Sequence, residues 1–426
     1  MPIGLLYCAR RIRAVNGVTI QDFFEMRYKS KSVRGLATVV LIISLLGYTI
    51  GQLMGAGMLL STLTGMPYEW LVLIFAIACV VFLSFGGQYG VTITDAGMFV
   101  VMLLMVFVVG PMIVGKAGGI SAIVSAAYAQ PAAWSIKGLP GMNAMPFLLS
   151  IVPIWVMYSL ASPGYASRGY AARSDLEMMK ASFVTILMFL VIPAFIGFLV
   201  MPAVKILGPD INPAEVAFTT VMINSVPTFW AGIGLAGIMA ALLTTASSFL
   251  LYVGMGLSRD FYKSIIKPDA SEKSEMMAAR LFQVVGVLAT ILFAMSDPAA
   301  LFWIVTYANG AFVTGWIPIL IGGFEWKGAS RQGALASLIV GPTSYVIFHL
   351  FKIIPTVDPI FWGLGFSTLA FIAISLMFKP SQAEKAWFEK FKSKPPGDRE
   401  IKAILSRAGG REQLVNEYSS LRNILY

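Results

Sequence analysis

The chain has 426 residues, of which 58% are hydrophobic and only 12% are charged, and its mean hydropathy is +0.79. A soluble globular protein carries about 45–50% apolar and about 25% charged residues, so this composition indicates an integral membrane protein. With one histidine and two cysteines, the chain offers no His/Cys metal cluster and no disulfide framework, and most hydrolytic and redox chemistry is excluded. We therefore expect neither enzymatic activity nor a bound organic cofactor.

The first 35 residues form a predicted cytoplasmic segment with no cleavable signal peptide, because its first arginines follow the short apolar start instead of preceding it. Residues 36–378 then contain ten apolar runs near the roughly 20 residues that a bilayer-crossing helix needs. The runs are too continuous for a membrane β-barrel. The sequence predicts an all-α, polytopic transmembrane helical bundle with spans at about 36–63, 70–86, 92–115, 143–161, 180–203, 228–257, 278–295, 298–323, 332–352 and 358–378.

The basic residues predict the orientation of these spans. If the spans alternate, 27 of the 31 Lys and Arg residues fall on one side, and only Lys116, Lys137, Lys205 and Lys352 on the other. Cytoplasmic loops carry the excess of positive charge, so both termini are expected in the cytoplasm of a cell-membrane protein. The net charge of +10 is then explained by this asymmetry and by contact with anionic membrane lipid, not by nucleic acid.

Residues 379–426 form a basic cytoplasmic tail. Trp387, Phe388 and Phe391 share one helical face among lysines, a pattern typical of a helix that lies on the inner leaflet. Pro395, Pro396 and Gly397 are expected to end this helix.

Two spans contain residues that can interrupt a helix. Such breaks are tolerated at membrane depth where protein or a water-filled cavity covers the freed backbone groups, and secondary transporters build binding sites from them. Packing alone is the alternative, since Gly and Pro are ordinary in membrane helices. The residues concerned are Pro146 and Pro153 in span 143–161, with Pro163 and Gly164 just beyond it, and Gly310, Gly315 and Pro318 in span 298–323.

Span 228–257 carries four hydroxyl side chains within five residues, Thr244, Thr245, Ser247 and Ser248. Hard cations prefer oxygen ligands, and the two threonines with the carbonyl of Ala241 could supply several on one helix. The alternative is that these hydroxyls only hydrogen-bond to the preceding turn of their own helix.

The stretch 234–263 resembles the hydroxyl-bearing helix of the sodium:solute symporter family, and further segments resemble other motifs of that family in the same order along residues 17–378. The matching residues are Ala240–Ala241, Thr244–Thr245, Ser248 and Asp260–Tyr262–Lys263, then Thr19 to Tyr28, Gly86–Gly87 with Thr94–Asp95, Arg168 to Ser174, and Trp326–Lys327 with Gly333–Ala334. The resemblance implies a partial inverted-repeat transporter core and secondary active symport of a small organic solute with sodium by alternating access.

By the same resemblance, Ala241, Thr244, Thr245 and, less directly, Ser248 are candidate sodium ligands. Asp95 resembles the family's aspartate near the inner exit path of the ion, although an Asp also stabilises a helix start. The family has about three helices before the segment that matches 17–35, and one of them completes the sodium site. We therefore expect an N-terminally truncated member or a misplaced start, which would not transport alone.

Candidate solute contacts lie on three spans: Trp155, Tyr158, Ser159 and Ser162 on or just after 143–161, Gln52 on 36–63, and Thr306, Tyr307 and Asn309 on 298–323. Each could instead form interhelical hydrogen bonds. Nothing in the sequence selects the solute, and the oligomeric state stays unknown.

Other functions remain as alternatives: a non-functional or regulatory fragment of such a transporter, or a proton-coupled permease of the same fold. A membrane-embedded enzyme is disfavoured because His349 has no carboxylate near it in sequence, and the tail is too short to be a kinase.

Overall fold

The computed structural model describes residues 4–15, 17, 19–129, 144–171, 175–212, 214–295, 301–351, 353, 357–393 and 412. Within these ranges the chain is helical and contains no strand, as predicted. Several predicted features lie wholly or partly outside the described residues, namely the ends of spans 143–161, 298–323 and 332–352, motif residues 172–174, and the tail beyond residue 393 apart from residue 412.

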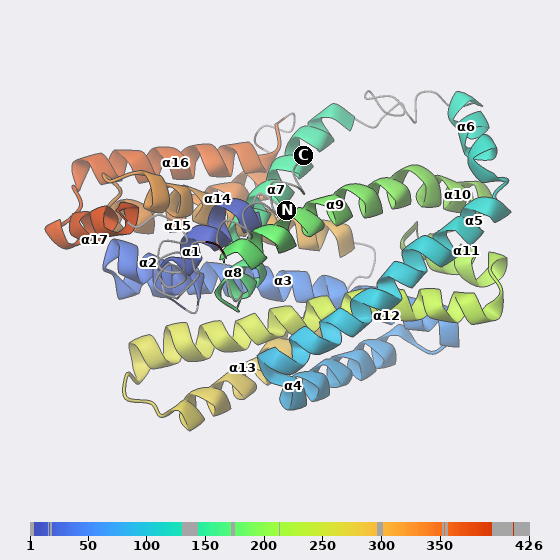
Figure 1. The fold of residues 1–426 in the computed structure, drawn as a ribbon, viewed down its shortest axis with the longest axis horizontal. Coiled ribbons are helices and arrows are strands. Elements are labelled where there is room, and N and C mark those ends of the chain that lie inside the picture. The colour runs from blue at the N-terminus through green and yellow to red at the C-terminus, as the bar shows by residue number, and fades with distance from the viewer. Residues whose placement is uncertain are drawn as a thin grey trace.

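The longer helices run roughly along the long axis of the molecule (Figure 1), with α2 and α17 at one end and α6 and α11 at the other. In chain order the elements are η1 (Gly4–Ala9), α1 (Arg10–Arg13), α2 (Ile20–Tyr28), α3 (Lys31–Thr64), α4 (Tyr68–Leu104), η2 (Met105–Val109), α5 (Gly110–Lys116), α6 (Gly119–Ala129), α7 (Ala144–Ala161), α8 (Pro163–Ala171), α9 (Asp175–Phe195), η4 (Ile196–Val200), α10 (Met201–Leu207), η5 (Ala214–Val216), α11 (Ala217–Ser225), α12 (Thr228–Met255), η6 (Gly256–Ile266), α13 (Glu272–Ala294), α14 (Leu301–Glu325), α15 (Arg331–Phe351), α16 (Pro359–Met377) and α17 (Gln382–Lys392).

Eight helices of the described residues are long and apolar enough to cross a membrane, and each overlaps one of the ten predicted spans. The other two predicted spans correspond to the shorter apolar stretch Tyr68–Leu83 at the start of α4 and to α7. The membrane-spanning helical bundle is therefore confirmed.

The ends of the helices follow from local capping residues. Thr19 and Asp22 form a capping box at the start of α2, and Ser30 accepts the Val33 N–H at the start of α3. α3 stops at Gly65, which has φ +68°, a conformation that costs glycine nothing and other residues about 1–2 kcal/mol. These caps place α2 directly against the first membrane helix.

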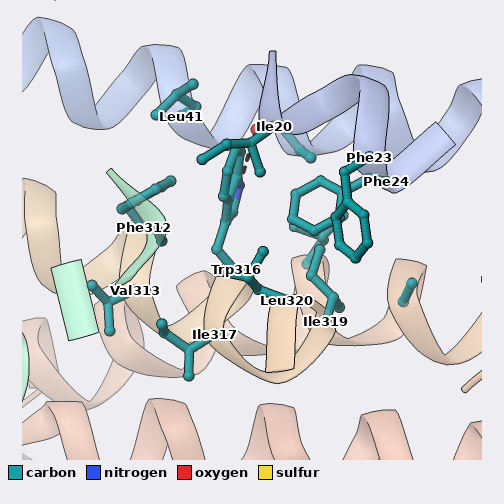
Figure 2. Close-up of a cluster of buried hydrophobic side chains, with 14 of the residues drawn as sticks. Ile20, Phe23, Phe24, Leu41, Phe312, Val313, Trp316, Ile317, Ile319 and Leu320 are labelled. Atoms are coloured by element: carbon teal, nitrogen blue, oxygen red, sulfur yellow. Dashed lines mark hydrogen bonds between the residues drawn. The ribbon is translucent and has the colours of Figure 1, made fainter. Parts of the chain in front are cut away.

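The largest hydrophobic cluster joins α2, α3, α7 and α14, and Figure 2 shows its part between α2, α3 and α14. At its centre Trp316 of α14 is fully buried, and its ring lies 4.9 Å from that of Phe24. The indole N–H donates to the Ala37 carbonyl of α3 at 3.1 Å, which satisfies the one polar group of this side chain. The cluster fixes α14 against α3.

The predicted interruption of span 298–323 is wrong for the described residues, because α14 is unbroken from Leu301 to Glu325 with Pro318 inside it. Proline lacks an N–H, so the carbonyl of Thr314 loses its helical donor. Ser367 of α16 donates to this carbonyl at 2.6 Å, and Ser337 of α15 donates to the Gly315 carbonyl at 3.1 Å. Neighbouring helices thus satisfy the backbone without a break.

The other predicted interruption lies after its span and not within it. α7 is continuous through Pro153 and ends at Ala161. Ser162 then separates α7 from α8, which begins at Pro163. The carbonyl of Ser162 accepts hydrogen bonds from the N–H groups of Tyr165 and Ala166. The chain is therefore interrupted where proline is favoured, at the first position of a new helix, because the N–H that proline lacks would have no helical partner there.

The tail helix α17 does not present its aromatic face to lipid, in contrast to the prediction from sequence. The Trp387 ring lies 5.9 Å from Phe23 of α2, and Phe391 stacks on Phe324 of α14 at 5.9 Å. Ion pairs Lys327–Glu389 and Lys392–Glu325 flank this contact. The aromatic partners offered by α2 and α14 bury this face against protein.

Candidate solute and cation sites

Four helices bring five aromatic rings together in the interior of the bundle. The Tyr48 ring of α3 lies 6.3 Å from Trp155 and 6.3 Å from Tyr158 of α7, and 4.6 Å from Phe249 of α12. Phe312 of α14 lies 5.9 Å from Tyr158. We call Tyr48, Trp155, Tyr158, Phe249 and Phe312 the aromatic cluster.

Two buried polar side chains border the aromatic cluster and have no hydrogen-bond partner among the described residues. Asn309, one helical turn before Phe312, is 0% exposed, and neither its Oδ1 nor its Nδ2 has a hydrogen-bond partner among the described residues. The same holds for the hydroxyl of Ser44, one turn before Tyr48. Each such group costs about 1–3 kcal/mol. Apolar walls with a few convergent polar groups are typical of small-molecule sites.

Two of the predicted solute contacts, Trp155 and Tyr158, belong to the aromatic cluster, and Asn309 borders it. Gln52 lies one turn beyond Tyr48 on α3, half-buried, and Thr306 lies one turn before Asn309 and is buried. Positions 44, 48 and 52 therefore line one face of α3.

The remaining predicted contacts lie elsewhere or are already engaged. Ser159 is buried and donates to the Val156 carbonyl of its own helix at 2.6 Å. Ser162 is buried at the junction of α7 and α8. The Tyr307 ring packs against the His349 ring of α15 in a tilted arrangement, with ring centroids 3.8 Å apart, so it does not face the aromatic cluster with Thr306 and Asn309.

The hydroxyls of α12 gather around one backbone carbonyl. Thr244 and Thr245 both donate to the Ala241 carbonyl, at 3.1 and 2.8 Å, and the side chains are half-buried. This is the back-bonded geometry expected of helical threonines. A donating hydroxyl keeps its lone pairs, so the carbonyl and the two hydroxyls remain three adjacent oxygens that could face a cation.

The hydroxyl group and the aromatic cluster are neighbours. Phe249 follows Thr245 by one turn of α12, and Ser248 is half-buried beside it. A cation held at the threonines would therefore lie within a turn of a solute held at the rings.

Asp95 lies inside α4, five residues into the apolar stretch Gly90–Lys116. It therefore does not mark a helix start. Its side chain is half-buried, and α4 packs along α12, which carries the hydroxyls. This is a suitable place for a carboxylate that assists a cation, and an ionisable residue at membrane depth is a functional candidate.

Sequence reasoning missed Ser44, Tyr48, Phe249 and Phe312. The spacing of Ser44 and Tyr48 with Gln52, at four-residue intervals on one helix face, was the available signal. The two phenylalanines carried none, because aromatic residues are frequent in every span.

Comparison with known proteins defines the class. Over 369 residues, covering 84% of this chain and 75% of the relative, the chain is 28% identical to the sodium/pantothenate symporter of Escherichia coli (strain K12). It is 26% identical to the sodium/proline symporter of the same organism, covering 89% of this chain and 78% of the relative. These relatives are membrane transporters and not enzymes, so the chain is of the secondary transporter class.

The fold and the family agree with this class. The solved structure of a Na⁺-coupled sialic acid symporter superposes with a TM-score of 0.73 at 19% identity, covering 89% of this chain and 81% of that chain. Residues 1–341 match the sequence profile of the sodium:solute symporter family. The chain belongs to the sodium:solute symporter family.

Proposed function

We propose that this chain is the transport domain of a sodium-coupled symporter that moves a small organic solute by alternating access. The observation that carries the proposal is the buried, unsatisfied amide of Asn309 beside the aromatic cluster. Phe249 of that cluster lies one helical turn from Thr245 on α12. A polar group left unsatisfied at this depth is expected where a ligand completes it.

In this proposal Ala241 supplies a carbonyl ligand to sodium, Thr244 and Thr245 supply hydroxyls, and Ser248 stands beside them. Asp95 lies on the path by which the ion leaves. Each sodium ion that enters down a membrane potential of 100 mV contributes about 2.3 kcal/mol before its concentration gradient is counted. That is enough for appreciable accumulation of a neutral solute.

The solute lies against Trp155 and Tyr158 with Asn309 as its polar partner. Because an amide both donates and accepts, the fitting solute has an apolar body and at least one hydrogen-bond donor and one acceptor. The names of the relatives make pantothenate and proline the first compounds to assay.

The boundaries 1–35, 36–378 and 379–426, contact with membrane lipid, a cell-membrane location and cytoplasmic termini are further parts of the proposal. They rest on the hydropathy and on the asymmetry of basic residues.

Uptake of radiolabelled solute into proteoliposomes, with and without a sodium gradient, tests this function. We expect uptake that requires sodium, and we expect Thr244→Ala with Thr245→Ala to raise the sodium concentration for half-activation at least tenfold, because two of the three adjacent oxygens are lost. Ser182→Ala removes a buried hydroxyl that donates to the Met178 carbonyl of α9 and serves as the control.

Uptake driven by a proton gradient alone would support the proton-coupled alternative. No uptake of any solute in a broad panel would support the fragment alternative. Unchanged sodium activation in the double variant would mean that these hydroxyls only pack the helix.

A further inference from the structure

A small cavity lies beyond the hydroxyl group along α12, at the end of the molecule that carries α2. Its volume is about 20 Å³, and its lining combines the polar residues Thr19, Ser167, Tyr252 and Asp260 with apolar residues that include Ile20, Leu41 and Pro163. A cavity of this size holds one particle about as large as a water molecule. Asp260 follows Thr245 by 15 residues, which places it about 20 Å further along the helix axis.

Asp260 is completely buried in this cavity wall. Its two oxygens differ in their surroundings. Oδ1 accepts hydrogen bonds from Thr19 Oγ1 at 3.1 Å and from the Arg34 guanidinium. Oδ2 is buried and has no partner among the described residues. A carboxylate oxygen in this state carries a large desolvation cost unless a further group completes it.

The charge of Asp260 is only partly compensated. Arg34 is shared among three carboxylates, at 2.8 Å from Asp22, 2.6 Å from Glu25 and in direct contact with Asp260. A second guanidinium, that of Arg259, lies 3.8 Å from Asp22, so two guanidinium groups stand beside three carboxylates and do not cancel their charge. The local field at the cavity therefore favours a cation.

The cavity wall also carries two neutral hydroxyl oxygens. The hydroxyls of Ser167 on α8 and Tyr252 on α12 lie 2.8 Å apart, and each keeps lone pairs that can accept a cation. Beyond Tyr252 the chain enters the π-helix η6 at Gly256, a form that occurs frequently at functional sites. Carboxylate plus hydroxyl oxygens are the ligand set of a hard cation.

We propose that this cavity binds one monovalent alkali cation between Asp260 Oδ2 and the hydroxyls of Ser167 and Tyr252. A divalent ion is disfavoured because the described residues contain no group of three His, Cys, Asp or Glu side chains that could hold a metal. The site is separate from the threonines of α12 and does not depend on the transport function proposed above. When filled, it links α8, α12 and η6.

Binding of ²²Na⁺ to the purified full chain in lipid nanodiscs, at constant ionic strength with choline chloride, tests the proposal. The measurement is made in the Thr244→Ala and Thr245→Ala background, so that the α12 hydroxyl group cannot contribute. We expect one saturable site in that background. Adding Asp260→Asn should weaken binding more than about tenfold, because the charged ligand is lost.

Ser167→Ala keeps every ion pair and therefore keeps the proposal testable if Asp260→Asn does not fold. It should weaken binding about 3–10-fold, as for one lost oxygen ligand. Ser258→Ala is the matched control, because Ser258 is buried two residues before Asp260 and donates to the Met255 carbonyl. It should leave the affinity within about twofold.

Absence of saturable binding in the background, or binding that neither Asp260→Asn nor Ser167→Ala weakens, overturns the cation site and leaves a cavity that holds only water. Sodium-dependent uptake by the unmodified chain is a separate measurement, so failure of this proposal is distinguishable from failure of the transport function.

Discussion

Asn309 and Ser337 are both fully buried polar side chains of the helical bundle, but they differ in whether the protein supplies a hydrogen-bond partner. The Asn309 amide has no partner among the described residues, whereas Ser337 donates to the Gly315 carbonyl at 3.1 Å. A buried group that stays unsatisfied lowers stability, and one that is satisfied raises it. This contrast separates a residue kept for a ligand from one kept for the fold.

We therefore predict opposite results for Asn309→Leu and Ser337→Ala. Asn309→Leu should raise the KM for solute uptake at least tenfold while leaving the thermal unfolding temperature unchanged or higher, because an unsatisfied amide is removed. Ser337→Ala should lower the free energy of unfolding by about 1 kcal/mol and leave KM unchanged. A lower unfolding temperature for Asn309→Leu with unchanged KM would make Asn309 a packing residue.

The sequence located some of these residues and not others for a definite reason. Thr306, Tyr307 and Asn309 lie at a similar depth in one span, which predicts a shared role, but adjacent helical positions are rotated by about 100°. Tyr307 consequently meets His349 of α15, while Thr306 and Asn309 share another face. Which face meets which helix depends on packing between segments far apart in the chain.

At the scale of elements, hydropathy was sufficient to place the spans, since length and apolarity alone define a membrane helix. Hydropathy did not predict that α14 is unbroken along its length. Pro318 suggested a break, but the compensating donor, Ser367, lies 49 residues away in sequence on α16. The sequence also could not predict that α17 packs on α2, because a lipid surface and an aromatic protein surface favour the same amphipathic pattern.

The pairing of Pro318 with Ser367 predicts a double-mutant result. Ser367→Ala alone should lower the free energy of unfolding by about 1–2 kcal/mol, because the Thr314 carbonyl loses the hydroxyl donor that α16 supplies. In a Pro318→Ala background the same change should cost less than about half as much, because the new backbone N–H can reach that carbonyl. Chemical unfolding in detergent micelles gives all four free energies.

Additive effects of the two substitutions would contradict this explanation of the unbroken helix. Ser375→Ala is the control. Its hydroxyl accepts the Ser330 N–H at 3.2 Å, so its cost should not change with the residue at position 318.

For the whole molecule, the asymmetry of 27 basic residues against four predicts a single orientation in the membrane. Exposed positions on opposite sides can report it. Met66, between α3 and α4, is 45% exposed, and Ser393 follows α17 and is exposed. The native cysteines leave the background low, because Cys8 and Cys79 are buried and burial raises the pKa of the Cys8 thiol well above its usual range, which keeps it protonated and unreactive.

We predict that a membrane-impermeant maleimide modifies Met66→Cys in intact cells, and modifies Ser393→Cys only after the membrane is permeabilised. The reverse pattern would place the basic loops outside and contradict the orientation. Comparable modification of both positions in intact cells would mean two orientations, which a difference of this size in basic residues does not allow. Eight spans and ten spans are both even numbers and place the two termini on the same side, so the expected labelling is the same whether or not Tyr68–Leu83 and α7 both cross the membrane with the other eight helices.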